Sequence, residues 1–200
     1  MGKTVEEIIE ITKDIVSFDM KDEDVANYKK HLDTLPPNPI IVDVGTGQAK
    51  TCIRLAFLRP DAQIWSWDWG HGHPENIPHE YFKMITDRLR DKGVTNVYFC
   101  VADSDKAWPT WNWQINALNV DASHSYDISL EDFKRWVPFV VSGGYIFIHD
   151  YNYLSGNDFK FNGLRQAVEE YFNDKEFEFL ENHIVSQGGA GAGFLCIKKL

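Results

Sequence analysis

The sequence predicts a Rossmann-like α/β fold, in which a seven-stranded, mostly parallel sheet carries helices on both faces. Three observations lead to this prediction. From residue 40 onward, short β-branched runs alternate with amphipathic helical segments, which is typical of parallel sheets. Several of these runs end in glycine or acidic residues that lead into a helix. Two final strand-like segments flank a glycine-rich stretch, which predicts an antiparallel hairpin at or near one edge of the sheet.

Two amphipathic helices are expected before the alternating region. The first covers residues 4–16 and begins with Thr4 and Glu7, which are spaced as in a capping box. The second covers residues 22–34. Their apolar stripes need a cover, which is either the main domain or a second subunit, so we also expect a homodimer. The predicted organisation is a helical extension over residues 1–37 and a main domain over residues 38–200.

The main domain is expected to alternate regularly between strands and helices. Strands are predicted over residues 40–44, 63–68, 97–101, 115–121, 145–148, 176–183 and 193–199. Helices are predicted over residues 49–58, 79–92, 128–137 and 164–172. Gly143 and Gly144 predict a turn before the fifth strand. Because ligands of such sheets bind beyond the carboxyl ends of the strands, the candidate site residues are those that follow each strand.

Composition and charge exclude several classes of protein. The 200 residues are 44% hydrophobic, which is enough for a sizeable core and argues against a disordered chain. Thirty acidic residues oppose 20 basic ones, for a net charge of −10, so we expect neither nucleic acid nor membrane partners. The three cysteines are scattered, and neither a bilayer-spanning run nor a signal-peptide pattern is present. These features predict a cytoplasmic protein with reduced thiols.

The turn after the first predicted strand reads Asp-Val-Gly-Thr-Gly-Gln-Ala. Gly45 and Gly47 would let the backbone pass close to a ligand and turn sharply into a helix. A P-loop is excluded because Val44 and Ala49 stand where its glycines are required. A dinucleotide fingerprint fails because Lys50 takes the place of its third glycine. A tight turn without any ligand would give the same short pattern.

Asp68 closes the second predicted strand, 25 residues after Asp43 (68 − 43). This is close to the spacing of roughly 20 residues at which a carboxylate binds ribose hydroxyls in nucleotide-binding sheets. A helix N-cap or a solvated loop acid is the alternative. Together with the glycine turn, Asp68 favours a ligand that contains a nucleoside.

Motifs at five strand ends resemble, in order, those of class I S-adenosylmethionine-dependent methyltransferases. They are the glycine turn, Asp68, Ala102-Asp103-Ser104, the segment VDASHSY over 120–126 and the segment GGYIFIHDY over 143–151. Within this class the chain is most similar to the small-molecule O-methyltransferase branch that includes macrocin-type and cephalosporin-hydroxylase-like proteins. The resemblance covers roughly residues 38–199. The sequence departs from the usual motifs at Ala49, Ala122 and Ser123, where glycine, glycine and aspartate are common.

The resemblance implies a binding site for S-adenosylmethionine. The glycine turn would pass under the methionine part, Asp68 would bind the ribose, and Trp69 would stack on the adenine. The residues after the third strand would lie at the adenine edge, and Asp121 would face the sulfonium. The implied cofactor-binding residues are Asp43, Gly45, Thr46, Gly47, Asp68, Trp69, Asp103, Ser104 and Asp121.

The resemblance also implies methyl transfer to a hydroxyl of a small-molecule acceptor, with Asp121 and His124 as catalytic residues. In metal-dependent members the ligands stand where Asp121, His149 and Asp150 stand, so Mg²⁺ or another divalent cation would assist. His124 stands in the place of a general base, a role that suits imidazole. Two alternatives stay open: hard Mg²⁺ prefers oxygen ligands to His149, and His124 would also be explained as a residue that only shapes its loop.

Other features allow more than one interpretation. A group of three histidines after the second predicted strand would be a zinc site or a polar lid. Six of the tryptophans would be core residues or an aromatic wall for the acceptor. These residues are His71, His73 and His79, and Trp65, Trp67, Trp69, Trp108, Trp111 and Trp113. The whole chain would alternatively be a non-catalytic nucleoside-binding protein that acts through a partner. An NAD-linked oxidoreductase is disfavoured by Lys50 and Asp43.

Overall fold

The computed structural model describes residues 3–16, 20–70, 78–103, 110–151, 159–173, 175–184 and 193–200. Its centre is a seven-stranded sheet with the order β3-β2-β1-β4-β5-β7-β6. The strands are β1 (Ile40–Val44), β2 (Gln63–Asp68), β3 (Val97–Val101), β4 (Ile115–Val120), β5 (Val140–His149), β6 (Phe177–Ile184) and β7 (Gly193–Lys199). β7 runs antiparallel to both β5 and β6, and the other neighbours are parallel. The predicted fold class and the closing hairpin are confirmed.

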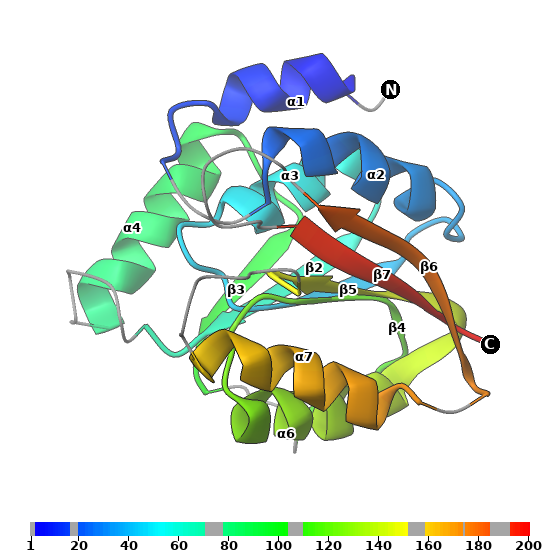
Figure 1. Cartoon of the computed structure of the whole chain (residues 1–200). Coiled ribbons are helices and arrows are strands. Elements are labelled where there is room, and N and C mark those ends of the chain that lie inside the picture. The colour runs from blue at the N-terminus through cyan, green and yellow to red at the C-terminus, as the bar shows by residue number, and fades with distance from the viewer. Residues whose placement is uncertain are drawn as a thin grey trace.

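Helices cover both faces of the sheet (Figure 1). They are α1 (Val5–Thr12), α2 (Asp22–Leu32), α3 (Lys50–Leu58), α4 (Pro78–Asp91), α6 (Tyr126–Trp136) and α7 (Phe159–Tyr171). The first four lie on one side and the last two on the other (Figure 1). The predicted capping box is present: Thr4 N donates to Glu7 Oε2 at 2.7 Å, and Glu7 N donates to Thr4 Oγ1 at 3.2 Å. α1 is shorter than expected and ends at Thr12.

The predicted turn at Gly143 and Gly144 is wrong, because both glycines lie inside β5. The pairing of β5 with β4 shifts register there: Ile115 pairs with Val140, whereas Ala117 pairs with Tyr145. The extra residues are accommodated as an irregularity of the strand, in which Gly143 has φ +80°. Glycine at such a point is typical of a bulge.

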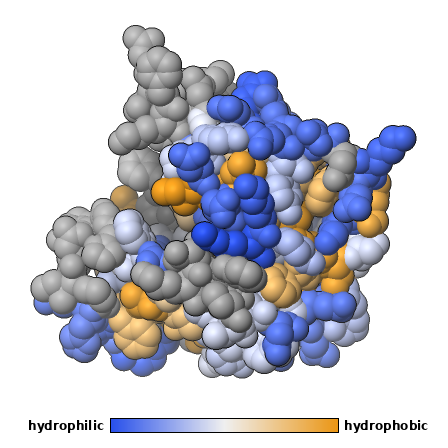
Figure 2. All heavy atoms as spheres, turned by 90° about the horizontal axis from the view of Figure 1, so that it is seen from below, coloured by the Kyte–Doolittle hydropathy of each residue, from blue (hydrophilic) through white to orange (hydrophobic). Residues whose placement is uncertain are grey.

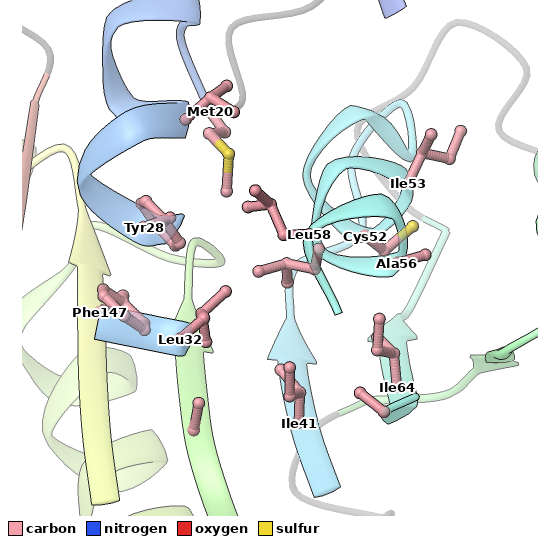
Figure 3. Close-up of a cluster of buried hydrophobic side chains, with 14 of the residues drawn as sticks. Met20, Tyr28, Leu32, Ile41, Cys52, Ile53, Ala56, Leu58, Ile64 and Phe147 are labelled. Carbon is pink, nitrogen blue, oxygen red and sulfur yellow. The ribbon is translucent and has the colours of Figure 1, made fainter. Parts of the chain in front are cut away.

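The two N-terminal helices pack into the same core as the sheet. Ile8, Tyr28 and Leu32 are fully buried and belong to one cluster with Ile41 of β1 and Phe147 of β5. Figure 3 shows Tyr28 of α2 beside Phe147 of β5. The expected boundary at residue 37 therefore separates two stretches of sequence that share one core. Since the chain itself covers these apolar stripes, they do not require a second subunit, and the homodimer stays a prediction.

A buried arginine ties the N-terminal helices to the glycine-turn helix α3. Arg54 is fully buried. Its Nε donates to Thr12 Oγ1 at 2.9 Å, and its Nη1 donates to the Met20 carbonyl at 2.8 Å. It also forms an ion pair with Asp22. Every polar group on this side chain thus has a partner, which a buried guanidinium requires.

The surface of the molecule is mixed in hydropathy. The face seen from below carries hydrophilic residues interspersed with small hydrophobic patches (Figure 2). Among the described helices, none is both long enough and apolar enough to span a bilayer. The three cysteines are free; Cys52 and Cys196 are buried, and Cys100 is half-buried.

Candidate functional site

The site lies where the strand order reverses, between β1 and β4. The backbone after β1 touches the backbone after β4: Asp121 N donates to the Val44 carbonyl at 2.8 Å. Gly45 has φ +98°, and a Cβ at this residue would lie 2.1 Å from the Asp121 carbonyl oxygen. Only glycine fits such a conformation and such an approach.

One cavity of about 720 Å³ opens at this point. Its size is within the range of small-molecule sites, roughly 300–1,000 Å³. The strand ends contribute Gly45, Gly47, Asp68, Trp69, Asp103 and Asp121 to its lining. The structure therefore brings together, around one space, predicted residues from four separate strand ends.

Asp68 is held in place by backbone amides. Its Oδ2 accepts a hydrogen bond from Gly47 N at 3.0 Å, and its Oδ1 accepts one from Gly70 N at 2.8 Å. The glycine turn is also fixed from α4, because the Tyr81 hydroxyl donates to the Gly47 carbonyl at 2.7 Å. Each carboxylate oxygen keeps a second acceptor site, so Asp68 can still accept hydrogen bonds from a ligand in the cavity.

Two predicted cofactor residues lie beneath the turn rather than on the cavity wall. Asp43 and Thr46 are both fully buried. Ser66 of β2 joins them: its Oγ donates to Asp43 Oδ2 at 2.7 Å and lies 2.7 Å from Thr46 Oγ1. In this arrangement both side chains support the glycine turn from below.

Other predicted residues fall in different places. Trp69 is 54% exposed at the cavity. Ser104, His71, His73 and Trp108 lie outside the described residues. Trp111 is buried and packs edge-on against Trp65 and Trp136, so this part of the aromatic group is core, whereas Trp113 is 45% exposed.

Carboxylates and histidines cluster at the ends of β4 and β5. Asp121, His124 and Asp150 offer ligand atoms that all lie within 4.8 Å of one another. His124 Nε2 lies 3.4 Å from Asp150 Oδ2. The sequence placed His149 in this set, but His149 lies behind it and is only 2% exposed. Its Nδ1 is 3.3 Å from both Asp121 Oδ1 and Asp150 Oδ1.

The charges of this cluster support one another. Burial by itself would lower the pKa of His149, but the carboxylates of Asp121 and Asp150 outweigh burial and raise it well above the ordinary value. Burial would raise the pKa of Asp150, yet the imidazoles of His124 and His149 hold it well below its ordinary value. The positive charge that this raised pKa favours on His149 thus lies behind the side chains of Asp121 and Asp150.

The donor set fits a divalent cation of intermediate hardness. One imidazole and two carboxylates suit Mn²⁺, Fe²⁺ or Zn²⁺, whereas Mg²⁺ prefers oxygen ligands alone. The same residues also form an imidazole–carboxylate pair that can accept a proton.

Sequence reasoning missed the contribution of α6 to the cavity. The helix adds a row of side chains to the lining: Asp127, Ile128, Glu131, Asp132 and Arg135. Their spacing is that of one helix face. The signal was available, since this helix follows directly from the VDASHSY segment, but charged residues on a helix are most often simply solvated.

Solved structures with the same fold include several methyltransferases. An O-methyltransferase from Klebsiella pneumoniae, described as putative, aligns over 100% of this chain and 91% of its own, with TM-score 0.72 and 13% identity. The O-methyltransferase TomG from Streptomyces achromogenes, solved with S-adenosylmethionine, aligns over 100% and 92%, with TM-score 0.70 and 16% identity. An rRNA methylase from Streptococcus thermophilus aligns over 92% and 99%, with TM-score 0.67 and 17% identity.

These identities establish a shared fold. A comparison with curated proteins finds no match. A family model described as a methyltransferase domain, however, matches residues 42–151. This range is more than half of the chain and runs from β1 to the end of β5, so it includes the glycine turn, Asp68 and the Asp121–His124–Asp150 cluster. The chain therefore belongs to the methyltransferase domain family, in agreement with the class I S-adenosylmethionine-dependent enzymes that its motifs resemble.

Proposed function

We propose that this methyltransferase transfers the methyl group of S-adenosylmethionine to a hydroxyl group of a small molecule. The observation that carries the proposal is that one cavity of about 720 Å³ has the glycine turn, Asp68 and Asp121 together in its wall. A cofactor that spans the ends of β1, β2 and β4 needs these residues on one surface. The acceptor would then lie beyond Asp121, beside His124 and Asp150.

The cofactor half of the cavity supplies binding and alignment. Gly45 and Gly47 leave room for the backbone to run under the methionine part, and Asp68 accepts the ribose hydroxyls. Trp69 and Asp103 also line the cavity, and we assign them to the adenine. Methyl transfer is an in-line displacement, so holding donor and acceptor in the right geometry supplies much of the rate.

The Asp121–His124–Asp150 cluster, which meets the cavity at Asp121, supplies a proton acceptor. A hydroxyl attacks well only when it loses its proton, and His124 is the group we assign to take it. Asp150, 3.4 Å from His124 Nε2, would stabilise the resulting imidazolium. Asp121 would face the sulfonium, whose positive charge it complements.

A metal-assisted version of the same reaction is favoured by the Asp121–His124–Asp150 donor set. A divalent cation bound there would lower the pKa of the acceptor hydroxyl. In that version His124 is a ligand rather than the base. His149 remains behind the set in both versions, which changes the ligand assignment that the sequence suggested.

The small-molecule acceptor is supported by charge. The net charge is −10, and α6 brings Asp127, Glu131 and Asp132 to the cavity. A phosphate backbone would be repelled by this surface. Since an rRNA methylase shares the fold, the acceptor assay should include rRNA.

Binding of S-adenosylhomocysteine is the first test. Isothermal titration should show one site per chain, and Asp68→Ala should weaken it more than about tenfold by removing a charged hydrogen-bond acceptor. Asp91→Ala is the matched control, because Asp91 is 68% exposed on the far end of α4. Failure of the wild-type protein to bind at millimolar ligand would contradict the proposal.

Turnover separates the remaining alternatives. Methyl label from S-adenosylmethionine should enter a small-molecule metabolite fraction and not purified rRNA; label in rRNA alone would refute the small-molecule acceptor.

His124→Gln should lower turnover about 100-fold with unchanged S-adenosylhomocysteine affinity. Activity that survives EDTA would exclude the metal-assisted version, whereas activity lost to EDTA and restored by Mn²⁺ would support it. Cofactor binding without any turnover would indicate the non-catalytic alternative.

A further inference from the structure

A chain of buried hydrogen bonds runs under the sheet edge from the N-terminal helix α2 to the glycine turn. The Tyr28 hydroxyl donates to Asn119 Oδ1 at 2.7 Å, and Asn119 Nδ2 donates to Asp43 Oδ1 at 2.8 Å. From the other end, Ser66 Oγ donates to Asp43 Oδ2 at 2.7 Å, and Thr46 Oγ1 lies 2.7 Å from Ser66 Oγ. None of the five side chains is more than 1% exposed. The chain crosses α2, β4, β1 and β2 and ends in the turn.

The direction of every bond in this chain follows from the number of hydrogens. A hydroxyl has one proton, and Ser66 uses its proton on Asp43, so Thr46 must donate to Ser66. Burial, followed by the nearby carboxylates, raises the pKa of Tyr28 well above its ordinary value, so its hydroxyl keeps its proton and donates to Asn119. All donors therefore point from both ends toward the Asp43 carboxylate, and each bond polarises the next.

The glycine turn leads into a residue, Ala49, whose backbone is in an unfavourable conformation. Gly45, Gly47 and Ala49 all have positive φ, at +98°, +53° and +68°. For alanine this left-handed conformation costs about 1 kcal/mol or more. Thr46 sits between the two glycines, with its side chain buried below them. The bond from Thr46 to Ser66 thus fixes the middle of the turn while the amide of Gly47 faces Asp68.

We propose that Tyr28 is a positioning residue for the cofactor site, which acts through Asn119, Asp43 and Ser66 on Thr46 and so on the glycine turn. The N-terminal extension then contributes to cofactor binding through α2. This inference rests on the proposed function for its ligand. Loss of the Tyr28 hydroxyl leaves Asn119 Oδ1 buried without its donor. The hydrogen bonds from Asn119 to Asp43 and onward to Thr46 then weaken.

The test uses a pair of matched variants. Tyr28→Phe removes only the hydroxyl and keeps the ring, which stacks on Phe147 at a centroid distance of 4.3 Å. Tyr145→Phe is the control: its hydroxyl lies 2.8 Å from Thr34 Oγ1, so it also joins the N-terminal segment to the sheet, but outside the chain of bonds. We expect Tyr28→Phe to weaken S-adenosylhomocysteine binding about 5- to 10-fold and Tyr145→Phe to leave it within about twofold.

A double-mutant cycle and hydrogen exchange show whether the effect passes through the turn. If it does, Tyr28→Phe and Thr46→Val weaken binding less in combination than the product of their separate effects. Amide exchange over residues 44–49 should also rise in Tyr28→Phe, and not in Tyr145→Phe, without ligand. Equal effects of the two tyrosine variants, or unchanged exchange in Tyr28→Phe, would overturn the inference. Because exchange is measured without ligand, it decides whether Tyr28 supports the glycine turn even if the wild-type protein fails to bind S-adenosylhomocysteine, a failure that would refute the proposed function.

Discussion

Replacing Gly45 by alanine is the sharpest test of the contact between the β1 and β4 ends. The added Cβ would lie 2.1 Å from the Asp121 carbonyl oxygen, 2.5 Å from its carbon and 2.9 Å from Ala122 N. Ordinary contact begins at 3.4 Å. All three atoms belong to the backbone, so no flexible side chain can move aside. The turn and the end of β4 must separate, and they form one wall of the cavity.

The expected cost has two parts. The left-handed conformation, with φ +98°, costs an alanine about 1–2 kcal/mol, and overpacking of a close contact costs about 1–3 kcal/mol more. Gly45→Ala should thus lower the free energy of unfolding by about 2–5 kcal/mol. Separation of the two backbones also displaces Asp121 relative to Asp68. We therefore expect S-adenosylhomocysteine affinity to fall more than about tenfold.

Gly93→Ala isolates the clash from the backbone strain. Gly93 has φ +71°, but a Cβ there meets nothing within 4 Å, so this variant should lose only about 1 kcal/mol and bind ligand normally. Urea unfolding followed by circular dichroism, together with titration calorimetry on the folded variants, gives both quantities. If Gly45→Ala is no less stable than Gly93→Ala, or binds as tightly as the wild type, the proposed contact does not limit this site.

Two further predictions concern stability. Arg54→Met should lower the free energy of unfolding by about 3 kcal/mol, because it leaves buried polar partners unsatisfied; Arg90→Met, at a 69% exposed side chain, should have no measurable effect, and equal losses would contradict the role of Arg54. The hydrogen bond from Arg59 lowers the pKa of Asp61 to about 2 from its ordinary 3.8. The contribution of the Asp61 carboxylate to the free energy of unfolding is therefore present above about pH 4 and is lost as the pH falls toward 2. Since Asp61 is 38% exposed, screening limits this contribution to less than about 1 kcal/mol. The difference in unfolding free energy between the wild type and Asp61→Asn should shrink from pH 6 to pH 2.5. A difference that stays constant would refute the lowered pKa of Asp61.

Most of the fold was predictable because each element has a local signal. The strand pattern located six of the seven strands to within a residue or so, and Thr4 with Glu7 correctly marked the start of α1. The exception was β5, where Gly143 and Gly144 looked like a turn. Glycine pairs have the same local preference in a turn and in a strand bulge, so only the pairing with β4 decides between them.

The cofactor side of the site was predictable for a similar reason. Residues that follow parallel strands meet at one edge of the sheet, so Gly47, Asp68 and Asp121 had to be near each other if the strand order was right. Sequence position could not distinguish the residues that line the cavity from those that support the glycine turn from below. Asp43 and Thr46 belong to the same motif as Gly45 and Gly47, yet their side chains point into the protein and form hydrogen bonds there.

The reaction side depends on one backbone conformation that no motif specifies. Successive side chains of a strand point to opposite faces, so the neighbours His149 and Asp150 diverge unless the chain leaves the strand. It does so at Asp150, which has φ +57° and whose N donates to the Gly193 carbonyl at 2.8 Å. Asp150 then lies beside His124, while His149 keeps its place in the strand, with Nε2 4.0 Å from Asp24 of α2. A motif at a strand end thus indicates which residues are close to the site, but the choice between adjacent residues is made by the dihedral angle at which the strand ends.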